Sequence, residues 1–122
     1  RIAAPPGALS ALSVIIQVQA SAEVVLTVPK TAFYPQPKVD SAVLLLERHA
    51  EPPVPSDRMR QFEELVHAAF KQPRKLVGNS LANGLGITKP EAVEILKQAG
   101  IGPNVRPQDV AIQDWVRLFE MR

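Results

Sequence analysis

Cysteine is absent from this chain of 122 residues, which excludes disulfide bonds, zinc sites built on thiolates and a thiol nucleophile. Long apolar runs are absent as well, and no segment approaches the roughly 20 consecutive apolar residues needed to span a bilayer. No basic segment followed by an apolar stretch opens the sequence, so nothing in it indicates secretion. These absences favour a cytoplasmic protein that has no membrane partner.

Neither sign of charge dominates, because the formal net charge is only +2. Any contact with nucleic acid must therefore depend on local clusters of basic side chains. The two histidines, His49 and His67, have no second ligand three or four residues further on, so no metal site is predicted. Gly84-Leu85-Gly86 has no Lys-Ser/Thr after it and does not follow a strand, which speaks against a phosphate-binding loop. No complete catalytic machinery is visible.

An apolar content of 46% is ordinary for a globular fold and too high for a disordered tail. The length allows one domain, or a small domain plus part of another. Because the chain begins at Arg1 rather than Met, we interpret it as a fragment of a longer protein.

The first half of the chain predicts one helix and two strands. Residues 9–20 favour a helix with Leu9, Leu12 and Ile16 on one face, although residues 14–19 could also alternate as a strand. Residues 23–28 are rich in β-branched side chains and are predicted to form a strand. Residues 42–46 are almost wholly apolar, as expected for a strand buried on both faces. We expect an antiparallel pair at one side of a larger sheet that is mostly absent.

Residues 48–56 have the composition of a linker, and four stretches with helical spacing follow it. Ser56 is suited to cap the first of these helices, which Pro73 would end. The second is predicted from Arg74 to about Ala82, because Asn83-Gly84 and Gly86 should break it.

The third helix begins with a predicted capping box, in which Thr88 bonds forward and Glu91 reaches back, and it stops at Gly100. The fourth carries apolar side chains at helical spacing between Ile112 and Phe119. Together, the four stretches predict a small helical domain with its own core.

The segment FYPQPKVDSA, residues 33–42, places two aromatic side chains on a loop that Pro35 and Pro37 stiffen. A base whose amine is to be modified must leave its stack and enter a slot lined by aromatic or apolar groups. Phe33 could supply one wall of such a slot. The alternative is that Phe33 and Tyr34 cover the edge of a core.

Basic side chains gather at the junction of the first two helices of the second half. Lys71, Arg74 and Lys75 would suit phosphate oxygens there, although a solvated helix end is an equally good interpretation. Arg106 could be a further cation facing the same substrate, or it could tie down helix ends.

Four segments, in this order, are similar to the ribosomal RNA adenine dimethyltransferases that act near the 3′ end of small-subunit rRNA. They are LSV at residues 12–14, VPKTAFYPQPKVDSAV at 28–43, FEELVHAAFKQPRKLVGNSL at 62–81 and RPQDVAIQDWVRL at 106–118. The resemblance runs through essentially the whole chain.

The resemblance implies an α/β fragment followed by an α-helical domain. Residues 1–47 would be the last helix and two strands of a Rossmann-like methyltransferase sheet, residues 48–56 a linker, and residues 57–122 a four-helix domain that binds rRNA. The family uses S-adenosylmethionine to place two methyl groups on N6 of each of two neighbouring adenines. Its glycine-rich cofactor loop and its Asn-Leu-Pro-Tyr motif lie upstream, so this chain alone should neither bind the cofactor nor methylate.

For single residues, the resemblance implies that Phe33 packs on the flipped adenine and that Lys38 and Asp40 shape the loop or contact RNA. It implies that Lys71, Arg74 and Lys75 face the RNA of the assembling 30S particle. Departures from the family pattern are Pro73 and Gly78, where Arg is common, and Ala111, where a serine caps the last helix.

Three rival interpretations remain open at this point. One is the sibling group that dimethylates a single adenine of large-subunit rRNA and confers macrolide resistance. Asp40 argues against it, because the sibling group usually has another residue there. The second rival is an RNA-binding or ribosome-assembly module without chemistry of its own. The third is a purely structural helical protein, which would have no affinity for RNA.

Overall fold

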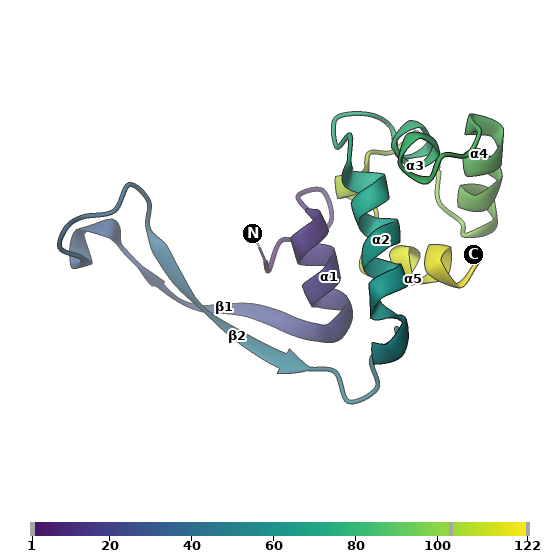
Figure 1. The fold of residues 1–122 in the computed structure, drawn as a ribbon. Helices are drawn as coiled ribbons and strands as arrows, with labels where there is room; N and C mark the ends of the chain where they lie inside the picture. The colour runs from purple at the N-terminus through teal and green to yellow at the C-terminus, as the bar shows by residue number, and fades with distance from the viewer. Residues whose placement is uncertain (1, 103, 122) are drawn as a thin grey trace.

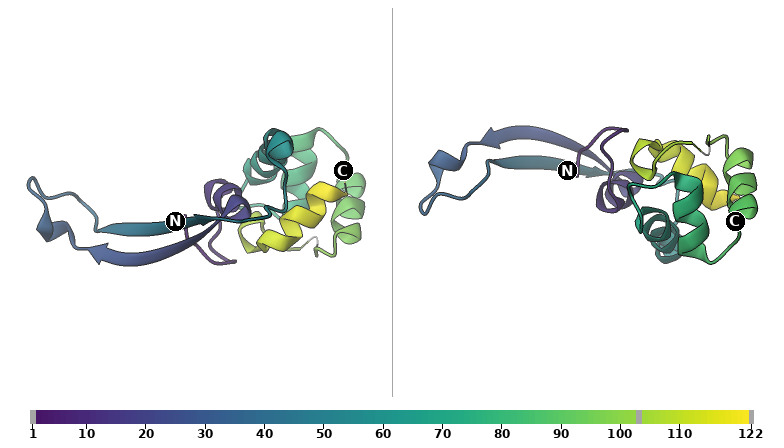
Figure 2. Two further views of the ribbon diagram at one scale, coloured as in Figure 1. Left: turned by 90° about the horizontal axis from the view of Figure 1, so that it is seen from below. Right: turned by 90° about the horizontal axis from the view of Figure 1, so that it is seen from above.

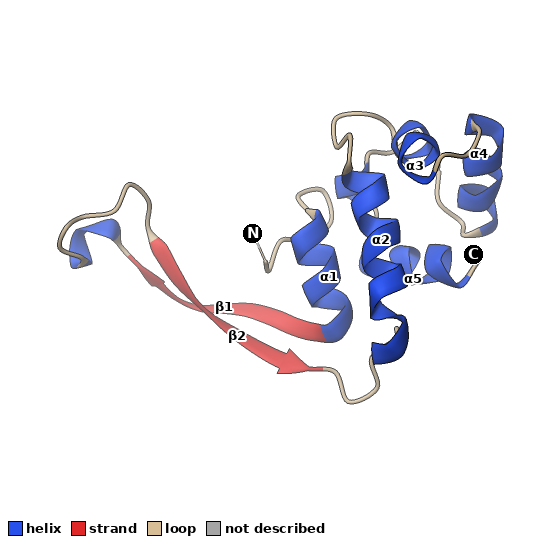
Figure 3. Ribbon diagram, viewed as in Figure 1, coloured by secondary structure: helices blue, strands red, loops and turns tan. Residues whose placement is uncertain are grey.

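The computed structural model describes residues 2–102 and 104–121. Within these residues, five helices form one body and a two-stranded hairpin projects from it (Figure 1 and Figure 3). The elements are α1 (Ala11–Gln19), β1 (Ala20–Val28), β2 (Ser41–Arg48), α2 (Met59–Phe70), α3 (Val77–Leu85), α4 (Lys89–Gln98) and α5 (Ile112–Glu120). Short 3-10 turns precede α2 and α5 and open the loop after β1, at Ser56–Arg58, Pro107–Asp109 and Lys30–Ala32.

The two strands pair antiparallel, as predicted, and both are longer than predicted. The register runs from Ala20 opposite Arg48 to Val28 opposite Ser41. It shifts between Val24 and Leu26, which leaves one extra residue in β1 and forms a β-bulge. His49 continues the pairing towards α1, since its backbone N–H donates to the Gln19 carbonyl over 3.0 Å.

The hairpin exposes its apolar side chains, as expected for an antiparallel pair from which the rest of a larger sheet is absent. Burial needs a further strand or a helix on each face, and the two strands of this sheet pair only with each other. The large apolar side chains that are exposed on the two strands are Val24, Val25, Leu26, Val43, Leu45 and Leu46.

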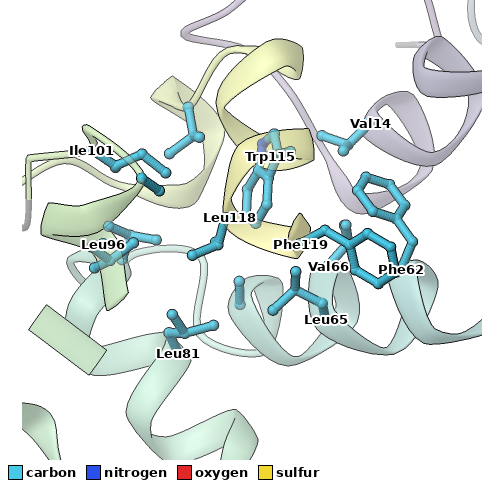
Figure 4. Packing of buried hydrophobic residues seen from close by; sticks show 14 of the residues in the cluster. Val14, Phe62, Leu65, Val66, Leu81, Leu96, Ile101, Trp115, Leu118 and Phe119 are labelled. Carbon is cyan, nitrogen blue, oxygen red and sulfur yellow. The ribbon is translucent and has the colours of Figure 1, made fainter. Parts of the chain in front are cut away.

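One hydrophobic core joins α1 to the four later helices (Figure 4). Phe62 and Phe119 meet edge to face with ring centres 5.5 Å apart, and Phe70 stacks on Trp115 at the same separation. Val54, from the predicted linker, is only 2% exposed and belongs to the same core. The largest fully buried side chains include Trp115, Phe62, Leu65, Leu81, Leu96 and Leu118.

Helix α1 is capped as strongly as any helix in the chain. Ser10 accepts a hydrogen bond from the Ser13 N–H, and the Ser13 hydroxyl oxygen accepts one from the Ser10 N–H over 2.7 Å. Of the side chains predicted to share one face, Leu9 is buried but Leu12 is 41% exposed, and Val14 and Val18 are the buried residues within the helix. A helix that is apolar nearly all round can bury either face, and its packing against α2 and α5 decides between them.

Two of the helix boundaries predicted around α2 and α3 are also wrong. Ser56 makes no side-chain cap; it lies in a 3-10 turn, and α2 begins after Arg58. Helix α3 begins at Val77 instead of Arg74, and it continues through Asn83-Gly84 to Leu85, where Gly86 caps it with a φ of 68°. Glycine readily adopts this left-handed conformation, so Gly86 rather than Gly84 is the stop signal.

Helix α4 has the predicted ends. The Thr88 hydroxyl oxygen accepts a hydrogen bond from the Glu91 N–H over 3.3 Å, and Gly100 follows the helix with a φ of 76°. The return bond of the predicted capping box, from the Glu91 side chain to Thr88, is not among the hydrogen bonds of the described residues.

Helix α5 lacks a side-chain cap, because Ala111 occupies its N-cap position with extended backbone angles. We expect Ala111→Ser to raise the free energy of unfolding by about 1 kcal/mol, since a serine hydroxyl there can accept a backbone N–H of the first turn. Urea denaturation of the two proteins measures this difference. Thr88→Ala is the matched control at α4 and should lower stability by a similar amount; a loss of stability in Ala111→Ser would contradict the assignment of this N-cap.

Candidate nucleic-acid interface

The loop at the tip of the hairpin is held closed by a side chain predicted to shape it. The Asp40 carboxylate accepts a hydrogen bond from the Lys30 backbone N–H over 2.8 Å. A 3-10 turn then carries the chain from Lys30 to Ala32, closed by the Ala32 N–H donating to the Pro29 carbonyl over 3.0 Å. The loop therefore has a defined path at the point where it presents its aromatic residues.

Both aromatic side chains of this loop reach solvent. Phe33 is 44% exposed and Tyr34 is 100% exposed, so neither belongs to the core. Lys38 is exposed on the same loop. Within the described residues, the pair does not cover the edge of the core that the helices form.

We expect Asp40→Ala to loosen this loop without changing the stability of the helical body. The carboxylate holds one exposed backbone N–H, so its loss should accelerate hydrogen exchange at the Lys30 amide and leave global stability within about 0.5 kcal/mol. Hydrogen exchange followed by NMR measures the first effect, and Asp57→Ala, another exposed aspartate, is the control. Unchanged exchange at Lys30 would show that the carboxylate does not hold the loop.

A second candidate surface lies where α2 passes into α3. Lys71, Arg74 and Lys75 are all exposed on this connection. Gln72 organises it: its backbone carbonyl accepts hydrogen bonds from the Ser80 hydroxyl over 2.6 Å and from the Lys75 N–H over 3.0 Å.

The Gln72 side chain adds a third bond, because its Oε1 accepts from the Asn83 amide over 2.8 Å. Gln72 was not predicted as a functional residue, and its place within the matched segment at 62–81 was the only signal for it. Its three bonds fix the connection that carries the basic residues.

Arg106 joins the same surface from the segment before α5. Its Nε donates to the Arg74 backbone carbonyl over 3.1 Å, which is the tying role that the sequence left open. A hollow of about 480 Å³ lies here, lined by Pro73, Arg74, Arg106 and Gln108. Because the side chain of Arg106 is exposed, its guanidinium can also face a ligand.

The predicted site residues thus form two groups. Lys71, Arg74, Lys75 and Arg106 lie together at one end of the helical body, and we call them the basic junction. Phe33 and Lys38 belong to the loop between β1 and β2, and this loop lies far from that body in all three views (Figure 1 and Figure 2). No cluster of His, Cys, Asp and Glu suited to a metal ion occurs within the described residues. No helix within them is long and apolar enough to cross a membrane.

Comparison with known proteins identifies the family of this chain, which combines a hairpin loop with a basic helical surface. The sequence model of the family described as ribosomal RNA adenine dimethylase matches residues 1–122, which is the whole chain. The chain belongs to this family. The family resemblance predicted from the four segments is confirmed.

Curated relatives of this chain are named as methyltransferases of the small ribosomal subunit. It is 39% identical to "Ribosomal RNA small subunit methyltransferase A" of Latilactobacillus sakei and 40% identical to the protein of the same name from Geobacillus thermodenitrificans. These matches cover 98% and 97% of the chain, and 42% of each relative. The chain therefore spans about two-fifths of the length of these relatives.

Solved structures of two methyltransferases share the fold of this part. The 23S rRNA methyltransferase ErmE matches with a TM-score of 0.66 at 30% identity, over 94% of this chain and 46% of that one. A dimethyladenosine transferase from Plasmodium falciparum matches with a TM-score of 0.73 over 97% of this chain and 50% of that one. At 17% identity, the second match supports the fold alone.

The family uses S-adenosylmethionine, but the described residues of this chain do not fit that cofactor. A dinucleotide-type or methyl-donor site at a sheet edge needs a glycine-rich turn after a strand. The loop after β1 has no glycine, and β2 leads into the proline-rich segment 48–56. The hollow at Arg106 and a second of about 330 Å³ beside Phe119 both lie on the helical body.

Proposed function

We propose that this chain is the C-terminal part of an S-adenosylmethionine-dependent enzyme that dimethylates N6 of two adjacent adenines near the 3′ end of small-subunit rRNA. In this proposal, residues 1–47 complete the catalytic domain, residues 48–56 connect, and residues 57–122 dock on the rRNA of the assembling subunit. The observation that carries the proposal is the family match over all 122 residues together with two exposed surfaces suited to RNA.

The basic junction is the docking surface in this proposal. Lys71, Arg74 and Lys75 lie on a connection that three hydrogen bonds of Gln72 hold in place, so little ordering is needed when RNA binds. Contacts of this kind with phosphates position a protein on RNA without reading its sequence. Selection of the target adenines then belongs to the hairpin end of the chain.

The hairpin serves the chemistry by shaping the target pocket. Phe33 is solvent-exposed on a stiff loop, where its ring can stack on an adenine that has left its helix. Lys38 is exposed on the same loop and is suited to a phosphate of that nucleotide. The exposed apolar faces of β1 and β2 fit strands that pack at the side of a larger sheet, which the rest of the enzyme would supply.

Transfer of labelled methyl groups from S-adenosylmethionine to ribosomal particles tests the proposal. The full-length protein that carries this chain should methylate adenine in small-subunit particles and leave large-subunit particles unlabelled. Phe33→Ala should lower the rate while Phe33→Tyr retains much of it, because the ring is kept. Absence of label in small-subunit particles would refute the proposal.

A second candidate function is the dimethylation of large-subunit rRNA. The 30% identity and the shared fold with the 23S rRNA methyltransferase ErmE favour it. The higher identity of 39% and 40% to small-subunit enzymes places it second. Label confined to large-subunit particles in the same assay would select it.

A further inference from the structure

Tyr34 is a large aromatic side chain that does not belong to the hydrophobic core of the described residues. It is 100% exposed, whereas no phenylalanine or tryptophan side chain of the described residues is more than 44% exposed. Burying an aromatic ring is strongly favourable, so a fully exposed ring on a stiff loop suggests a surface that meets a partner. We propose that Tyr34 stacks on the nucleobase next to the one that Phe33 holds, so that the loop grips two neighbouring bases.

The two rings are neighbours along a bent segment of the loop. The chain bends from Phe33 to Pro35, and both aromatic side chains are exposed there. In this proposal each ring holds a base of its own, because two rings one residue apart suit two bases that are close along the strand.

The charges of the loop select RNA as the partner. Lys30 and Lys38 are exposed, and they flank the aromatic pair in sequence. Asp40 is the acidic side chain of the loop, and its Oδ1 is engaged by the Lys30 backbone N–H. Aromatic rings between free cations match the bases and phosphates of a single strand.

This inference rests on the proposed function and extends it from one target base to the base beside it. The experiment measures the binding of the full-length protein to a fluorescent single-stranded oligoribonucleotide that contains two adjacent adenines. In two further oligonucleotides, one adenine or the other is replaced by an abasic nucleotide. The protein variants are Tyr34→Ala, Tyr34→Phe, Tyr34→Leu and Phe33→Ala.

We expect Tyr34→Ala and Tyr34→Leu to bind about tenfold more weakly than the unaltered protein, within the range for loss of one stacked base. Tyr34→Phe should bind as the unaltered protein does, because stacking needs the ring and not the hydroxyl. One abasic replacement should weaken the unaltered protein without further weakening Tyr34→Ala. The other abasic replacement should weaken binding by the unaltered protein without further weakening binding by Phe33→Ala.

Three results would overturn the inference, and they separate it from the proposed function. If Phe33→Ala couples to one abasic site while Tyr34→Ala couples to neither, only the role of Tyr34 falls. If neither variant nor either abasic site changes binding, the role that the proposed function gives to Phe33 falls with it, while the methylation assay still tests the proposed function itself. If Tyr34→Ala lowers the melting temperature of the full-length protein and leaves RNA binding unchanged, Tyr34 packs against protein.

Discussion

Replacing Lys71, Arg74 and Lys75 together by alanine should weaken RNA binding by about 100-fold to 1,000-fold at 0.1 M salt. Each phosphate contact contributes about 0.9 to the slope of log affinity against log salt on a duplex, so three lost contacts should lower its magnitude by between 2 and 3. All three side chains are exposed, so the fold should be unaffected. Filter binding of small-subunit rRNA by the full-length protein across a salt series gives both quantities.

A matched variant shows whether this effect depends on position or only on net charge. Arg60, Lys89 and Lys97 are also exposed cations of the helical body, but they lie outside the basic junction. Replacing these three by alanine removes the same charge and should change the slope much less. If both triple variants bind equally well, the junction is not the docking surface.

Gly84→Ala should destabilise the protein by about 1–3 kcal/mol, the usual cost of overpacking. A Cβ atom at Gly84 would lie 2.3 Å from the Ala68 carbonyl oxygen and 2.7 Å from its carbon. Both atoms belong to the backbone of α2, so the two helices must move apart to admit a methyl group. The intrinsic preference of helices for alanine over glycine, about 1 kcal/mol, offsets only part of this cost.

Gly102→Ala is the control for this experiment. A Cβ atom there would meet no atom within 4 Å, and its φ does not lie in the left-handed region. We expect its stability to be unchanged or to rise by a few tenths of a kcal/mol, through the unfolded chain. Urea denaturation of the three proteins compares them. Equal stability of Gly84→Ala and Gly102→Ala would contradict the close crossing of α2 and α3.

That crossing explains why one prediction from the sequence failed. Asn83-Gly84 is a strong turn signal by local chemistry, but the helix continues through it because Gly84 is where α2 approaches α3. In α1, packing partners far along the chain likewise bury Val14 and Val18 and leave Leu12 exposed. A local sequence pattern does not specify contacts between segments that are distant along the chain.

Structural predictions that depend on a single residue were confirmed where that residue acts on nearby backbone. Thr88 and Gly100 end α4 as predicted, and Asp40 holds the loop as predicted, because a cap or a loop clamp involves only nearby backbone. The sequence was used to predict candidate residues for the site, but it did not predict how these residues are arranged in space. Arg106 lies 32 positions from Arg74, and only the structure shows the bond between them.

The most direct test of the proposed dimethylation of small-subunit rRNA is the nucleoside content of rRNA from cells with and without the gene for this protein. We expect N6,N6-dimethyladenosine to disappear from the 3′-terminal fragment of small-subunit rRNA when the gene is deleted and to return when the gene is restored. Mass spectrometry of that fragment measures it. Unchanged N6,N6-dimethyladenosine in the small subunit after deletion would contradict the claim.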